Sequence, residues 1–179
     1  MATTTRTTKA ATKTSKKATP AKRAAAKKPA TPRQQDAVAI LRADHKKVSE
    51  LFAQYEKARS TTKKFSLVTD ICTELSVHAQ LEEEIFYPAV KAALKDHELV
   101  PEATVEHATL KDLIAQVEGI TPDGEMFDAK IKVMSEYVKH HVKEEQTEMF
   151  PKAKATRLDM MALGADILAR KEVLLAERG

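Results

Sequence analysis

Two histidine–glutamate pairs recur in the sequence with the same spacing. His78 precedes Glu82 by four residues, and His141 precedes Glu145 by four residues. Residues four apart in a helix lie on one face on successive turns, so each pair offers an imidazole nitrogen and a carboxylate oxygen to a single ion. Imidazole and carboxylate together suit iron and other first-row transition metals. The spacing therefore suggests metal binding.

Two further histidines lie on apolar faces of predicted helices. His45 and His107 have apolar residues at the same three offsets (−4, +3 and +7), namely Leu41, Val48 and Phe52 for the first and Ala103, Leu110 and Ile114 for the second. Such spacing forms a core-facing stripe on a helix. A single histidine there is usually a hydrogen-bonded core residue. Four imidazoles and two carboxylates are costly to bury without partners, and a metal would satisfy them together.

The sequence also repeats itself. The segment HAQLEEEIFYP, which starts at His78, aligns without a gap with HVKEEQTEMFP, which starts at His141. Earlier in each half, DHKKVSELF around His45 aligns with EHATLKDLI around His107. Repetition on this scale predicts two helical hairpins of one design and a bundle with a pseudo-twofold repeat.

The hydrophobic pattern has a helical period throughout the body of the chain, and polar or proline-containing breaks divide it. We expect helices near residues 33–58, 62–95, 101–118, 123–154 and 156–177. Pro88 and Pro151 are expected to kink or end the helices that contain them. The predicted fold is all-α, an up-down-up-down four-helix bundle with an additional C-terminal helix packed outside it.

The charge is divided unequally along the chain. The first 35 residues contain ten Lys and Arg and no acid, which leaves a body of 144 residues with 20 basic and 26 acidic side chains. An Ala-, Thr- and Lys-rich segment cannot bury enough apolar surface to fold, so we expect a disordered basic tail. The predicted division is 1–33 for the tail, 34–155 for the metal-binding bundle and 156–179 for the additional helix.

The tail leaves two interpretations open. Spaced Lys and Arg neutralise phosphates without reading base sequence, which favours non-specific nucleic-acid contact. The alternative is a solubilising or targeting extension, and organellar import is less favoured because the segment lacks an amphipathic face. No apolar run approaches the roughly 20 residues that span a bilayer. The single cysteine, Cys72, excludes an internal disulfide and fits a reducing compartment. A cytoplasmic location, nucleoid-associated if the tail contacts DNA, is the expectation.

The spaced pattern of four histidines and two glutamates resembles the hemerythrin-type, or HHE cation-binding, domain. That resemblance implies a four-helix bundle around a non-haem di-iron centre, with Glu82 and Glu145 as bridging carboxylates and manganese or zinc as less favoured metals. The implied ligands are His45, His78, Glu82, His107, His141 and Glu145. The tail is similar to the tails of linker histones.

The pattern departs from that of the oxygen-carrying members, which have a second histidine on the third helix and a +5 spacing for the last carboxylate. Here Ala103 and Lys111 flank His107 at four residues, and Glu145 lies at +4 from His141. Fewer protein ligands leave open metal positions, which admit O2, H2O2 or NO. Tyr137 and Glu74, each four residues before a site histidine, are further candidates to reach the metal, with ordinary packing or solvated roles as the alternative.

Three functions remain open at this stage. The first is a di-iron protein that binds or reacts with a small oxidant in sensing, stress response or iron handling, with weak catalase-, peroxidase- or oxidase-like activity undecided. The second is a non-catalytic iron-binding or storage module. The third is a nucleic-acid-associated protein that acts through residues 1–33.

Overall fold

The computed structural model of the chain describes residues 35–95 and 97–178, and all secondary structure within these ranges is helical. The elements are α1 (Ala37–Lys57), α2 (Thr61–Leu81), η1 (Glu82–Phe86), α3 (Tyr87–Leu94), α4 (Leu99–Ala115), α5 (Glu125–Glu144), η2 (Glu145–Met149), α6 (Phe150–Lys154) and α7 (Met160–Arg178). The expected tail lies outside the described residues. Within these ranges, no helix combines the length and apolar character that crossing a bilayer requires.

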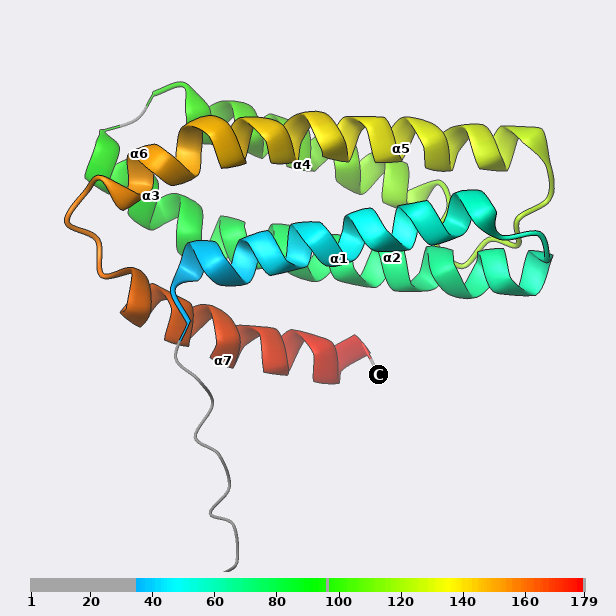
Figure 1. Ribbon diagram of the computed structural model, residues 1–179, viewed down its shortest axis with the longest axis horizontal. Helices are drawn as coiled ribbons and strands as arrows, with labels where there is room; N and C mark the ends of the chain where they lie inside the picture. The colour runs from blue at the N-terminus through cyan, green and yellow to red at the C-terminus, as the bar shows by residue number, and fades with distance from the viewer. Residues whose placement is uncertain (1–34, 96, 179) are drawn as a thin grey trace, which may run out of the picture. The chain divides into compact units, whose positions relative to one another are not determined.

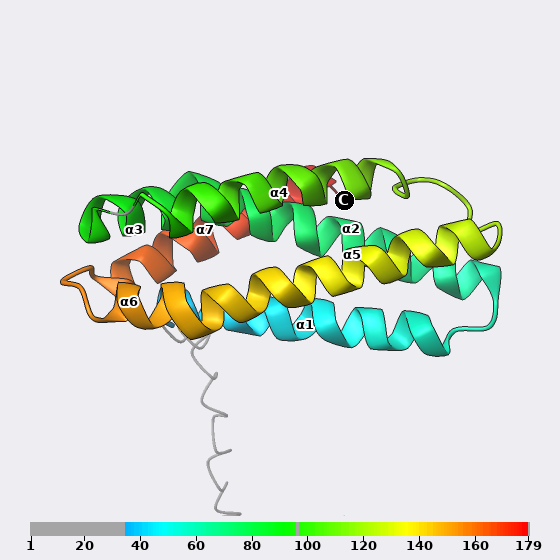
Figure 2. The same cartoon turned by 90° about the horizontal axis from the view of Figure 1, so that it is seen from above.

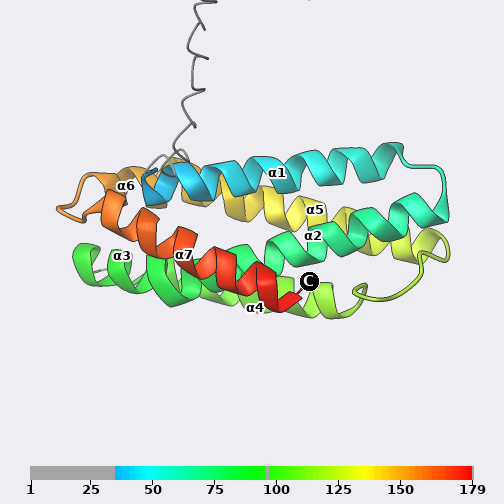
Figure 3. The same cartoon turned by 90° about the horizontal axis from the view of Figure 1, so that it is seen from below.

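The four long helices form two antiparallel hairpins. Helices α1 and α2 make one hairpin, α4 and α5 make the other, and the two hairpins are stacked as layers (Figures 1 and 2). Across the layers, α1 packs against α5 and α2 packs against α4. Helix α7 runs along the outside of the first hairpin and contacts α1 and α2 (Figure 3). Both hairpins therefore present their inner faces to one shared interior.

Side-chain caps set the starts of three helices. Asp36 accepts a hydrogen bond from the Ala39 N–H at 2.8 Å at the start of α1, and Ser60 accepts one at 3.2 Å at the start of α2. The expected start of the last helix at residue 156 is wrong. The carboxylate of Asp159 accepts from the backbone N–H of Met161 at 3.0 Å, so α7 begins later, at Met160.

Of the two outcomes expected for Pro88 and Pro151, a kink or an end of the helix, the structure excludes the end. Each proline lies in the first turn of a helix that continues an earlier one, and a single π turn precedes it. Proline lacks an N–H and its ring crowds the carbonyl four residues earlier, which in both cases lies inside the π turn. The widened i→i+5 turn accommodates this defect without breaking the helix. The π turns begin at Glu82 and Glu145.

The bundle has two apolar cores along its length. One includes Leu41, Phe86, Phe150 and Ile167 near the start of α1, and the other includes Phe52, Ile71, Ile131 and Met134 toward its end. Along α1, α2 with η1, α4, and α5 with η2, the buried histidines lie where one core gives way to the other. A layer of buried polar side chains therefore separates two hydrophobic clusters.

The attachment of α7 depends on Gly164. A Cβ placed on this buried glycine would lie 2.0 Å from the backbone oxygen of Gln35 and 3.0 Å from the backbone nitrogen of Ala37. We predict that Gly164→Ala destabilises the protein by about 1–3 kcal/mol, because the clash outweighs the better helix propensity of alanine. Chemical denaturation measures this, with Ala165→Ser on the exposed side of α7 as the control. A Gly164→Ala protein as stable as the control would contradict the close approach.

Candidate metal centre

The structure brings the six sequence-predicted ligands together in the polar layer. One histidine comes from each long helix, and one glutamate comes from the first position of each π turn. All six are buried, with at most 6% of the residue exposed: His45, His78, Glu82, His107, His141 and Glu145. The π turns thus place the two carboxylates at the centre of the bundle.

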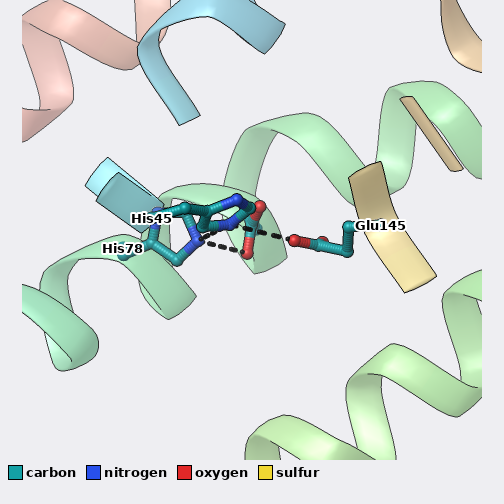
Figure 4. Close-up of side chains that lie close together, drawn as sticks. His45, His78 and Glu145 are labelled. Carbon is teal, nitrogen blue, oxygen red and sulfur yellow. Dashed lines mark hydrogen bonds and ion pairs between the residues drawn. The ribbon is translucent and has the colours of Figure 1, made fainter. Parts of the chain in front are cut away.

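The histidines form two close pairs, one from each hairpin. The Nε2 atoms of His45 and His78 are 2.9 Å apart, and those of His107 and His141 are 3.1 Å apart. Figure 4 shows His45, His78 and Glu145 converging on one point, with 3.1 Å between His45 Nε2 and Glu145 Oε2. Each pair thus offers two imidazole nitrogens to one position.

Each glutamate connects the two histidine pairs. Glu82 Oε2 lies 3.2 Å from His78 Nε2 and 3.4 Å from His107 Nε2. Glu145 Oε2 lies 3.1 Å from His45 Nε2 and 3.6 Å from His141 Nε2. Both carboxylates therefore contact one imidazole from each hairpin, as ligands shared between two ions would.

The outer nitrogen of each imidazole has its own polar neighbour, and these neighbours follow the internal repeat. His107 Nδ1 lies 3.1 Å from Glu83 and His45 Nδ1 lies 3.1 Å from Gln146, the residues that follow the two buried glutamates. Such outer partners orient metal-binding histidines.

The other two outer partners are the acids that precede the first histidine of each half. The Nδ1 atom of His141 lies 2.7 Å from Glu106 Oε2. The Nδ1 atom of His78 lies 3.7 Å from Asp44 Oδ2, an ion-pair separation longer than a hydrogen bond. Sequence reasoning did not single out these partners, although the acid before each histidine was visible in the repeat.

Burial and nearby carboxylates act in opposite directions on the histidines. Burial is the largest effect on His45 and lowers its pKa, despite the neighbouring Glu145. Burial also acts on His78, but the carboxylates of Glu82 and Asp44 outweigh it and raise the pKa to about 10. His78 therefore carries a proton at neutral pH that a metal ion would have to displace.

Tyr87 is a site residue that sequence reasoning missed. Its hydroxyl donates to Glu145 Oε1 at 2.8 Å and lies 3.2 Å from His107 Nε2 and 3.4 Å from Glu82 Oε2. A π turn brings residue i+5 over residue i, which places Tyr87 over Glu82. Burial, together with the two carboxylates, raises the pKa of Tyr87 well above its ordinary value. The aligned residue in the other half is Phe150, whose ring stacks on His45 at 5.7 Å.

The two other candidates do not join this cluster. Glu74 accepts a hydrogen bond from Lys47 at 2.6 Å and is in none of the metal-ligand groups of the described residues, and Tyr137 is half-buried. Within the cluster itself, Glu82 Oε1 is buried without a hydrogen-bond partner, and Glu145 Oε2 has only its ion-pair contacts with His45 and His141. Unpartnered buried carboxylate oxygens are costly. The donor set therefore fits cations in the space between the two histidine pairs.

The sequence matches the family model of the hemerythrin HHE cation-binding domain over residues 36–153. The chain belongs to this family. The family resemblance inferred from the sequence is therefore confirmed, and the matched range contains every ligand candidate. Among solved structures, the HHE fold is similar to a crystal structure of an HHE cation-binding domain protein from Mycobacterium kansasii. That match has a TM-score of 0.69 and 22% identity, and it covers 80% of this chain and 89% of the other.

A curated relative of this HHE chain is a protein of Nostoc sp. named DNA nickase. The two are 28% identical over 111 residues, which is 62% of this chain and 31% of the relative. The chain thus spans about a third of that relative's length.

Tyr87→Phe tests the hydroxyl that distinguishes the two halves. We predict a loss of about 1–3 kcal/mol of unfolding free energy in the metal-free HHE domain, because the buried Glu145 loses its hydrogen-bond donor. Thermal and urea unfolding measure this. Tyr137→Phe removes a hydroxyl outside the cluster and serves as the control. Equal stability of the Tyr87→Phe and Tyr137→Phe proteins would show that the Tyr87 hydroxyl does not support the site.

Proposed function

We propose that this HHE protein holds two non-haem iron ions and binds or reacts with a small oxidant. The supporting observation is that Glu82 and Glu145 each contact one histidine from both hairpins. His45 and His78 would hold one ion, and His107 and His141 the other, with the two glutamates shared. The up-down-up-down, hemerythrin-like arrangement of α1, α2, α4 and α5 belongs to the same proposal. The proposal also includes the division of the chain into a metal-binding bundle at residues 34–155 and an additional helix at residues 156–179.

The donor count favours a centre with open positions. Two imidazoles and two shared carboxylates give each ion four protein ligands, and iron accommodates more. Iron bound there would supply redox chemistry and exchangeable positions for O2, H2O2 or NO. The Tyr87 hydroxyl lies beside both shared carboxylates and donates to Glu145, which would hold that carboxylate in position for the ions. Apolar clusters flank the layer on both sides.

The side chains also control protons at the site. His78 and its partner Asp44 are buried at 6% exposure each, and His141 donates to Glu106. Burial lowers the pKa of His141, but the hydrogen bond to Glu106 and the charge of Glu145 outweigh it and raise the pKa. A cation bound at Nε2 would displace the proton there, while Asp44 and Glu106 face the Nδ1 atoms of His78 and His141 and orient the two imidazoles.

Loss of iron tests the ligand assignment. We predict that wild-type protein, loaded anaerobically with ferrous iron, binds two irons per chain, whereas His78→Ala and His141→Ala bind far less. Air-exposed wild type should show near-ultraviolet and visible charge-transfer bands. Iron should raise the melting temperature of wild type, because ligand binding stabilises only the folded state. This stabilisation should be lost in the His78→Ala and His141→Ala proteins.

The matched control is His97→Ala, which replaces an exposed histidine outside the cluster. Iron content and absorption should match those of wild type. Wild-type iron content in both the His78→Ala and His141→Ala proteins would refute the assignment. Iron uptake without iron-dependent loss of peroxide, O2 or NO would favour the alternative of a non-catalytic iron-binding or storage module.

A second candidate function is association with nucleic acid. Residues 1–33 contain ten Lys and Arg and no acid, and the name of the Nostoc relative refers to DNA. We predict that the full chain is retained on duplex DNA at low salt, and that retention falls steeply as salt rises. A chain that begins at residue 34 is the comparison, in a filter-binding assay across salt concentrations. Equal retention of both chains would remove the tail from consideration.

A further inference from the structure

A second group of metal-ligand side chains lies at the surface of the second hairpin. His140 Nε2 is 3.2 Å from Glu144 Oε1 and 3.7 Å from Glu106 Oε1. One donor atom from each of the three residues lies within 4.8 Å of the other two. The side chain of His140 is 61% exposed, so solvent ions reach the group directly. None of the three residues is among the six ligands of the buried centre.

This surface group connects to the buried centre. Glu106 faces both ways, because its Oε1 atom lies toward His140 while its Oε2 atom accepts from His141 Nδ1 at 2.7 Å. A small cavity lies beside it, lined by Glu102, Glu106, Glu144 and Glu145 among others. Glu145 is only 1% exposed, and its Oε2 atom faces His45 and His141 of the buried centre. Carboxylates therefore follow one another from the surface to a shared ligand of the centre.

The other hairpin does not repeat this opening. In the aligned half, Val77 and Leu81 stand where His140 and Glu144 are, and both are at most 1% exposed. The counterpart of Glu106 is Asp44, which forms an ion pair with Lys171 of α7. The ammonium group of Lys171 thus occupies the position beside Asp44 that corresponds to a cation beside Glu106. The fold holds the His45–His78 pair without such a surface group, so the group is not a requirement of the bundle.

We propose that His140, Glu106 and Glu144 form an exchangeable surface site for a divalent transition-metal ion, from which the ion moves to the buried centre. One imidazole with two carboxylates suits Fe²⁺, Mn²⁺, Co²⁺ or Zn²⁺ better than Mg²⁺ and Ca²⁺, which prefer oxygen ligands only. Three ligands at a half-exposed position leave the ion partly hydrated and free to exchange. The loading role rests on the proposed di-metal centre, whereas the surface site itself does not.

Cobalt binding tests the site. The probe is Co²⁺, measured by equilibrium dialysis and by its visible absorption on the full chain. We expect three Co²⁺ per wild-type chain, one of them weaker and rapidly exchanging. The variant His140→Ala/Glu144→Gln should bind two. Glu106 is left intact because it contacts His141. The control His97→Ala/Glu172→Gln makes the same two chemical changes at exposed positions and should bind three.

The outcomes separate the surface site from the centre. In a His78→Ala background the weak Co²⁺ should persist and should disappear when His140→Ala/Glu144→Gln is added, whatever the centre binds. A weak Co²⁺ that survives His140→Ala/Glu144→Gln, or a wild type without one, would overturn the surface site.

Loading kinetics test the role. Stopped-flow mixing with Fe²⁺ should show the His140→Ala/Glu144→Gln variant filling the centre about tenfold more slowly, at the low end of electrostatic steering effects. Its final iron content should equal that of wild type. An unchanged loading rate in a variant that has lost the weak Co²⁺ would overturn the loading role and retain the surface site.

Discussion

The rest of the structure depends on one constraint, the burial of four imidazoles and two carboxylates across the middle of an apolar bundle. Ionisable groups removed from water need compensation from neighbours. The structure supplies this compensation through successive polar contacts that lead from the histidines toward the surface. His107 contacts Glu83, which pairs with Lys111 at 2.6 Å near the surface. His78 faces Asp44, which pairs with Lys171 of α7. The outer helix thus takes part in the electrostatics of the layer as well as in its packing.

The pseudo-twofold repeat explains most of this layer, and its exceptions are confined to few positions. The ligands and their acidic outer partners follow the repeat. Tyr87 and Phe150 break it beside the ligands, since one supplies a hydroxyl to the carboxylates and the other stacks on His45. The exposed His140 and its buried counterpart Val77 break it farther from the ligands. The two ion positions of the proposed centre would therefore differ in their polar surroundings although their protein ligands are alike.

Much of the architecture could be predicted from the sequence because it depends on local periodicity. The helical period, the caps and the aligned halves predict the helical bundle and the inward direction of the six candidate ligands. The π turns could not be predicted in this way, since Pro88 and Pro151 also fit a kink or an end. Tyr87 was missed for the same reason. Its position over Glu82 requires the i→i+5 turn, whereas an ordinary helical projection turns it away.

Predicting the outer partners of the histidines requires knowledge of the contacts between neighbouring helices. Asp44 precedes His45 but faces His78, and Glu106 precedes His107 but contacts His141. Sequence spacing within one helix cannot show such contacts between neighbouring helices. The same holds for Gly164, whose role becomes visible only where α7 meets the backbone at the start of α1.

The two apolar cores on either side of the polar layer have a consequence for how the protein acquires metal. In a small domain whose only organising element is its metal, binding free energy is consumed by folding. Here each end of the bundle has its own buried cluster, so the apoprotein can assemble first and hold its ligands in place. Affinity then reflects ligation and proton displacement alone. The fraction of such preorganised sites that is occupied follows the concentration of free metal around the protein and therefore reports that concentration.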